Sequence, residues 1–194
     1  MMKSIWAVCL CSLAVLGWAK MGAENSLQLE LLPGQALKLE LSSGDYRIEP
    51  GATDQVVVIS QNKTQSGAKP RFGIDTSPQE AAVKVEGPKD YAAVIQVPKN
   101  SNLKVRLNGG RLRVNGVEGD KDIESNAGTV SIDVGKPENY ARVDASVDIG
   151  HIEAPPYQVV QEGFGRSFAR EGPGMYRLHA HVGTGEIILV AGGI

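Results

Sequence analysis

Cysteine and aromatic residues are scarce in this chain of 194 residues, and the scarcity of cysteine limits its chemistry. Cys9 and Cys11 are the only two cysteines, and aromatic residues make up 5% of the sequence. If the N-terminal segment that carries both cysteines is removed, the remaining chain has no disulfide, no thiolate metal site and no cysteine nucleophile. We therefore expect a domain that is held together by burial of apolar side chains and by backbone hydrogen bonds.

Clustered positive charge is also absent. Lysine and arginine together number 20 and aspartate and glutamate 22, for a net charge of −2, and the basic residues are scattered singly. A protein that binds nucleic acid needs a concentrated basic surface. The sequence therefore predicts no nucleic-acid partner.

One uncharged apolar run occurs near the N-terminus, at residues 5–19, after the short basic start Met1-Met2-Lys3. The run is shorter than the roughly 20 residues that a membrane span needs. It is typical of a secretory signal peptide. We expect residues 1–19 to be that peptide, with cleavage after Ala23 and an uncleaved membrane anchor as the two alternatives. The predicted location is secreted, or periplasmic and in the cell envelope.

Glycine is abundant, whereas helical periodicity is missing. The chain has 23 glycines, roughly 12% against a usual ~7%. Residues 56–59 and 93–97 are expected as strands, and residues 78–85 as the approach to another strand. The part that remains after processing, residues 20–194, is long enough to bury the core of one domain. The composition predicts a single all-β domain.

A short pattern recurs in this domain: a glycine, a polar residue, an apolar residue, any residue and a second apolar residue. Alternation with a period of two is typical of a strand with one face on a core and the other in water. Glycine suits the point where one short strand bends into the next, because it bends sharply or adopts positive φ at little cost. The five glycines that begin the pattern are Gly44, Gly110, Gly128, Gly150 and Gly185.

The spacing of the last four glycines indicates an architecture. They follow one another at 18, 22 and 35 residues. Spacings near 20 are typical of the stacked coils of a solenoid, in which each coil buries its apolar face against its neighbours. We therefore predict a single-domain β-solenoid, a β-helix-like stack of short strands with glycine turns. A Greek-key β-sandwich is the alternative, since it too is built from short alternating strands.

The same residues resemble a known family. Ser43-Gly44-Asp45, the step Val97-Pro98-Lys99 and the later turn glycines are similar to the motifs of bacterial putative adhesin domains, a β-solenoid family of domains of unknown function. The later turns lack the aspartate that follows glycine in the family pattern. The resemblance covers the chain from about Leu37 to Leu189. It implies a secreted or envelope-associated domain without known catalytic residues, of which relatives lie outside the membrane in envelope-stress systems and contact partners.

Histidines offer a candidate metal site. His179 and His181 are two residues apart on an expected strand, so both point to one face. With His151 as a third ligand, the set would suit Zn²⁺ or Cu²⁺. The competing interpretation places both strand histidines in solvent, because the residues that alternate with them are apolar. The sequence predicts no metal or other cofactor, and this set remains only a candidate.

Carboxylates offer a candidate catalytic site. Asp133, Asp144 and Asp148 are expected in adjacent coils, with Glu124 nearby. Glycoside hydrolysis needs a close pair of carboxylates. Acidic residues are also expected on the solvent face of alternating strands, where they keep the face soluble. No paired motif, no Ser-His-Asp order and no phosphate-binding glycine loop occurs, so no catalytic residue is predicted.

A longer interval, residues 155–174, separates the last two turns. It contains Phe164 and Phe168, which alternate with Arg166 and Arg170. Aromatic and arginine side chains are common anchors of interaction surfaces. The interval is expected to be either an exposed loop that contacts a partner or ligand, or a cap over the open end of the solenoid.

These observations predict a protein that is not an enzyme. We expect an adhesin-like binding or scaffolding domain whose partner is an envelope protein or a glycan. A carbohydrate-active enzyme on a β-helix is one alternative. An envelope-stress sensor or accessory domain that contacts a membrane partner is the other.

Overall fold

The computed structural model describes residues 19–21, 26–61, 69–88 and 90–192, of which residues 19–21 are described by their backbone alone. The predicted signal peptide, apart from Ala19, and its alternative cleavage site at Ala23 lie outside the described residues. In the part of the chain described, no helix is long and apolar enough to cross a membrane.

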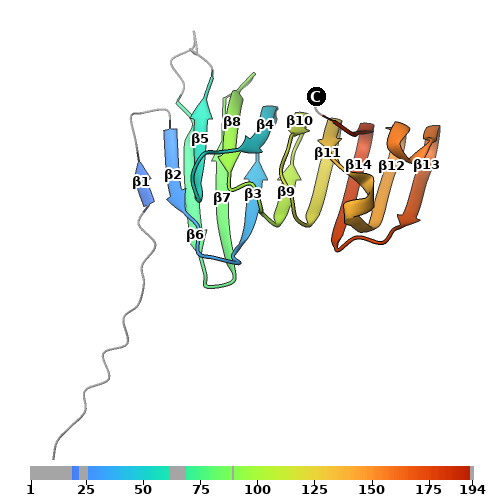
Figure 1. Ribbon diagram of the computed structural model, residues 1–194. Coiled ribbons are helices and arrows are strands. Elements are labelled where there is room, and N and C mark those ends of the chain that lie inside the picture. The colour runs from blue at the N-terminus through green and yellow to red at the C-terminus, as the bar shows by residue number, and fades with distance from the viewer. Residues whose placement is uncertain (1–18, 22–25, 62–68, 89, 193–194) are drawn as a thin grey trace, which may run out of the picture.

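The described chain is all-β, as the sequence predicts (Figure 1). Two single-turn 3₁₀-helices, η1 (Pro137–Asn139) and η2 (Pro155–Tyr157), interrupt the strands. The strands are β1 (Ala19–Met21), β2 (Ser26–Glu30), β3 (Ala36–Leu41), β4 (Gly44–Pro50), β5 (Gln55–Ser60), β6 (Arg71–Thr76), β7 (Glu80–Glu86), β8 (Ala92–Val97), β9 (Leu103–Leu107), β10 (Gly110–Val114), β11 (Lys121–Asp133), β12 (Tyr140–Ala154), β13 (Val159–Glu171) and β14 (Tyr176–Val190). The strands expected at residues 56–59, 93–97 and 78–85 are confirmed as β5, β8 and β7.

The strand pairings form two rows, and the four long strands β11 to β14 take part in both. Row A runs β6-β7-β3-β9 and continues through the first halves of β11, β14 and β12 to the second half of β13. Row B runs β1-β2-β5-β8-β4-β10 and continues through the second halves of β11, β14 and β12 to the first half of β13. The central pairings of both rows are parallel. They do not fit the Greek-key alternative, which is built from antiparallel sheets.

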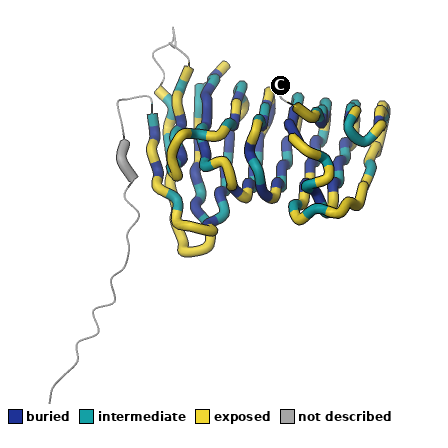
Figure 2. Tube along the Cα trace, viewed as in Figure 1, coloured by how far each residue is buried: buried dark blue, intermediate teal, exposed yellow. Residues whose placement is uncertain are grey.

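Alternate side chains of both rows meet in one hydrophobic core. In row A, Leu39, Val105 and Ile123 lie in register on neighbouring strands and are fully buried. In row B, Leu112 and Val130 do the same. Figure 2 shows the result as buried and more exposed residues alternating along each strand. The predicted period of two is therefore confirmed, with small aliphatic side chains as the repeated unit of the core.

The turn glycines lie side by side where the long strands pass from one row to the other. Gly44 pairs with Gly110, Gly110 with Gly128, Gly128 with Gly185, and Gly185 with Gly150. All but Gly44 have positive φ, between 104° and 147°. A β-carbon on any of these four would collide with the backbone of the neighbouring glycine. The positive φ and the close approach of the neighbouring backbone therefore both require glycine at these four positions.

The order of the strands corrects one expectation. β14 lies between β11 and β12, although it follows both of them in the sequence. Asp133 on β11 is therefore not in a coil adjacent to that of Asp144 and Asp148 on β12. The physical reason is the β12–β13 hairpin: β13 returns antiparallel along one side of β12 and leaves the other side free for β14. Neighbours in sequence are neighbours in a sheet often, but not always.

Candidate binding surface on strand β13

Strand β13 forms one end of both rows. It pairs with β12 along its whole length, and no other described strand pairs with it. The interval 155–174 is therefore not the exposed loop that the sequence offers as one alternative, because most of it is a 13-residue edge strand. An edge strand presents a line of unpaired backbone N–H and C=O groups. Figures 1 and 2 show this strand at the end of the molecule, with most of its residues exposed.

The core-facing side of β13 is polar where the inner strands are aliphatic. Gln161 lies in register with buried Ile152, and Arg166 with buried Val147. An amide or a guanidinium at these positions covers the end of the core with its aliphatic stem while its polar head reaches water. Terminal repeats need such a polar outer surface. This part of β13 therefore has the character of a cap.

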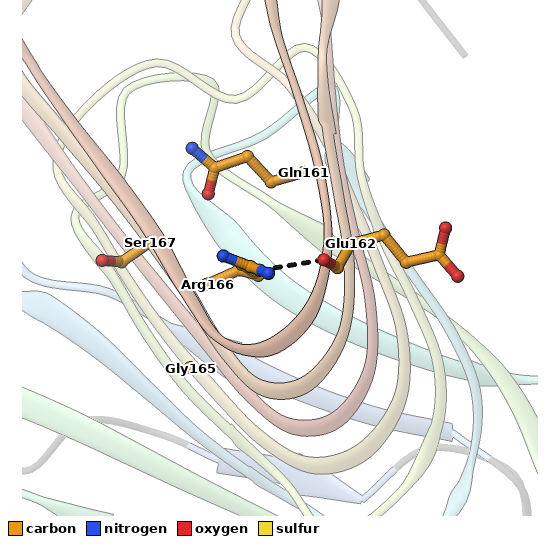
Figure 3. A pocket seen from close by; sticks show the side chains of 5 residues that line it. All are labelled: Gln161, Glu162, Gly165, Arg166 and Ser167. Carbon is orange, nitrogen blue, oxygen red and sulfur yellow. Dashed lines mark hydrogen bonds between the residues drawn. The ribbon is translucent and has the colours of Figure 1, made fainter.

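A polar hollow lies at the bend of β13. It has a volume of ≈ 440 Å³ and is lined by Gln161, Glu162, Gly165, Arg166 and Ser167. Figure 3 shows Gln161 and Arg166 reaching into the space inside the bend, above the stacked turns of the strands behind it. The Nε atom of Arg166 donates a hydrogen bond of 2.8 Å to the backbone oxygen of Glu162, which fixes the guanidinium across the bend.

The two phenylalanines of β13 occupy different environments. Phe168 is half-buried and packs against the core, with its ring centroid 6.0 Å from that of Tyr157. Phe164 is 77% exposed and lies in register with Ile149, which is 46% exposed. Phe168 thus closes the core, as the cap interpretation expects, while Phe164 is free for contact. Arg170 lies in register with buried Val143 and is exposed.

Sequence reasoning missed the other apolar residue of this surface, Val160, which is 70% exposed. It also missed the polar residues Gln161, Glu162 and Ser167 of the hollow. No clear signal marked them, because the interval lacks the apolar–polar alternation of the inner strands. The glycines of this interval favour a loop over a strand.

The three candidate histidines are not brought together. His179 and His181 project from the same side of β14 in row A, as expected, but His151 lies in row B. The Nδ1 atom of His181 is 3.0 Å from the hydroxyl of Ser146, and its Nε2 atom is 3.7 Å from a carboxylate oxygen of Asp148. The candidate three-histidine set is therefore not assembled, because the strands carry the histidines to different rows.

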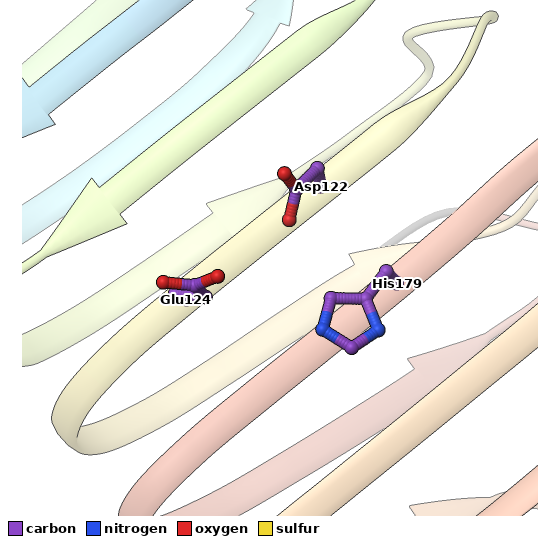
Figure 4. A group of neighbouring side chains, drawn as sticks. All are labelled: Asp122, Glu124 and His179. Atoms are coloured by element: carbon purple, nitrogen blue, oxygen red, sulfur yellow. The ribbon is translucent and has the colours of Figure 1, made fainter.

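Two other groups of ligating side chains form in its place. Asp122, Glu124 and His179 gather on β11 and β14 (Figure 4), and His151, Glu153 and Glu186 gather on β12 and β14. In the first group both carboxylates already have a cation. The guanidinium of Arg106 lies 3.1 Å from an oxygen of Asp122 and 2.9 Å from an oxygen of Glu124.

The four candidate catalytic carboxylates have separate partners. Asp133 accepts hydrogen bonds from the backbone N–H groups of Gly135 and Gly192. Asp144 accepts two from the guanidinium of Arg142, at 2.6 and 2.9 Å. Asp148 lies beside His181, and Glu124 beside Arg106. Each of the four carboxylates therefore already has a hydrogen-bond or ion-pair partner.

Comparisons with known proteins add little about function. No family model matches the chain, and no curated protein matches it. One solved structure is similar: a crystal structure described as a putative cell adhesion protein from Clostridium sporogenes ATCC 15579. The two chains are 14% identical with a TM-score of 0.49, and the similarity covers 89% of this chain and 99% of the other.

Proposed function

We propose that this chain is a non-enzymatic, adhesin-like binding or scaffolding domain that binds an extended polypeptide along strand β13. The observation that carries the proposal is the combination of a free 13-residue sheet edge with two strongly exposed apolar side chains on it, Val160 and Phe164. Soluble proteins usually shield such an edge with proline, with charged side chains, with a covering segment or by keeping it short. β13 contains no proline and is long.

The wider proposal keeps the sequence-based expectations of compartment and architecture. The parallel registers and the aligned turn glycines support describing the fold as a β-solenoid that ends at β13. The apolar run at residues 5–19 supports export to the cell envelope or beyond it. In that compartment the chain would present β13 to a protein of the envelope.

A polypeptide fits this surface better than a glycan does. The unpaired backbone groups of an edge strand match those of an added strand, which is the common mode of β-augmentation. Exposed Val160 and Phe164 offer apolar contacts. No ion pair among the described residues includes Arg166 or Arg170, so both are available to acidic side chains. The expected ligand is therefore an extended segment that carries apolar and acidic residues.

The test is a selection of 12-residue peptides from a displayed random library against the purified protein, run beside a glycan array. We expect extended peptides with apolar and acidic residues to be enriched. Their affinity should fall at least tenfold for Phe164→Ser, because alanine-type truncation of an exposed aromatic anchor removes contact area. The melting temperature should stay unchanged, since Phe164 is exposed in the free protein.

Ile74→Ser is the matched control. Ile74 is also an exposed apolar residue on an edge strand, but on β6 at the opposite end of row A. It should leave peptide affinity unchanged. Binding confined to the glycan array would overturn the choice of a polypeptide partner. Failure of the folded protein to bind either probe, or equal losses for Phe164→Ser and Ile74→Ser, would overturn the role of β13.

A further inference from the structure

A second group of polar side chains lies on the outer face of row B, on strands β12 and β14. His151 and Glu153 are two residues apart on β12, so they project to the same side. Glu186 on β14 lies in register with His151. One ligand atom from each of the three side chains lies within 4.8 Å of the other two, and all three residues are half-buried. We propose that His151, Glu153 and Glu186 bind one divalent cation of the Zn²⁺ type.

The chemistry of the three side chains suits this ion. Zn²⁺ takes histidine nitrogen and carboxylate oxygen ligands in sites with three protein ligands and one further position. The ligand atoms need only small side-chain rotations to close around one ion, because they start on neighbouring strands. The fourth position is left for a water molecule or another ligand, because within the part of the chain that the structure describes only these three side chains gather their ligand atoms at this place.

Charge balance separates this group from the one in Figure 4. In the Asp122–Glu124–His179 group, Arg106 already neutralises both carboxylates. Among the described residues, no ion pair or side-chain hydrogen bond includes His151, Glu153 or Glu186. Two carboxylates held this close without a cation repel each other, and a bound divalent ion removes that repulsion. The free ligands therefore point to the row B group as the metal site.

A cation at this place would join two strands. β12 and β14 are the last two parallel neighbours before the end of the fold, and the three ligands bridge them. Binding at ligands from both strands stabilises the folded state, since the unfolded chain does not hold them together. The site would therefore strengthen the end of the fold that carries β13.

The test is isothermal titration of the metal-free protein with Zn²⁺, together with thermal melts. We expect one Zn²⁺ per chain and a higher melting temperature in its presence. His151→Ala and the nearly isosteric Glu186→Gln should each weaken binding at least tenfold and remove the thermal shift. His179→Ala, a matched change in the other group, should keep both the affinity and the shift.

Each outcome decides the proposal. Absence of Zn²⁺ binding up to millimolar concentration would overturn it. So would binding that survives both row B variants, or binding that His179→Ala removes. Circular dichroism of the variants without metal shows whether each is folded. If His151→Ala does not fold, Glu186→Gln still tests the site.

Discussion

Replacing Gly128 by alanine is expected to lower the free energy of unfolding by about 3 kcal/mol or more, which is among the larger effects of a single substitution. Gly128 has a φ of +117°, a conformation that residues with a β-carbon rarely adopt. Its β-carbon would also collide with the backbone oxygen of Gly110 on the next strand. Relief of that collision would separate β10 from β11 in the middle of row B.

Gly135→Ala is the matched control for Gly128→Ala. Gly135 also has positive φ, 59°, but its added β-carbon meets nothing within 4 Å. This change should cost only about 1 kcal/mol, the usual penalty of a left-handed conformation. Denaturant unfolding followed by circular dichroism measures both. Equal losses in the two variants would show that the close stacking of the glycines contributes nothing.

The second large effect is a rise in stability at alkaline pH caused by Lys121. This lysine is 1% exposed and lies at a core position, in register with Leu103 and Leu178. Its ammonium donates hydrogen bonds to the hydroxyl of Tyr140, at 2.8 Å, and to the backbone oxygen of Gly119, at 3.1 Å. Burial lowers the pKa of Lys121 from 10.5 to about 8, although nearby carboxylates oppose the shift.

The direction of the effect follows from the two pKa values. Below pH 8 the lysine is charged in both states, and the folded state bears the cost of burying that charge. Between about pH 8 and 10.5 the folded protein has lost the proton while the unfolded chain retains it, so stability rises with pH. Taken alone, Lys121 contributes a rise of about 3 kcal/mol. Above pH 10 the curve should turn down, because burial raises the pKa of Tyr46 to about 12 and its ionisation favours unfolding.

Unfolding free energies measured at intervals from pH 7 to 11 test this prediction. Lys121→Met keeps the length and the apolar stem of the side chain, and it should flatten the curve between pH 8 and 10. Lys104→Met, a change on the outward side of β9, should keep the wild-type rise. If Lys121→Met and the wild type showed the same pH dependence, the ammonium of Lys121 would not be the cause.

Local features of this fold were predictable from the sequence. Alternation of apolar residues identified strands such as β5 and β8, and the recurring glycines identified where the long strands bend. These features depend on residues close in sequence. The pairing of β13 with β12 was missed because its glycines, Gly163 and Gly165, are strand-bend residues here and loop residues in many other proteins.

Long-range placement was not predictable. The spacing of the turn glycines contains no information on which side of β12 the last strand lies, and β14 enters between β11 and β12. That insertion places His151 beside Glu186. The candidate three-histidine set is not assembled because His151 follows its turn glycine into row B, whereas His179 and His181 precede theirs in row A. The exposure of Phe164 and the burial of Phe168 likewise depend on the bend between them.

The position of β14 is the central claim, because it leaves β13 as the free end and brings Glu186 to His151. Crosslinking of cysteine pairs with a one-carbon bifunctional thiol reagent tests it, in a chain with Cys9 and Cys11 replaced by serine. Thr129 and Glu186 lie in register on adjacent strands, about 5 Å apart, whereas Thr129 and His151 are two strands, about 10 Å, apart. We predict that the pair Thr129→Cys and Glu186→Cys crosslinks and that the pair Thr129→Cys and His151→Cys does not. The reverse result would mean that the strands stack in sequence order, and it would contradict the account.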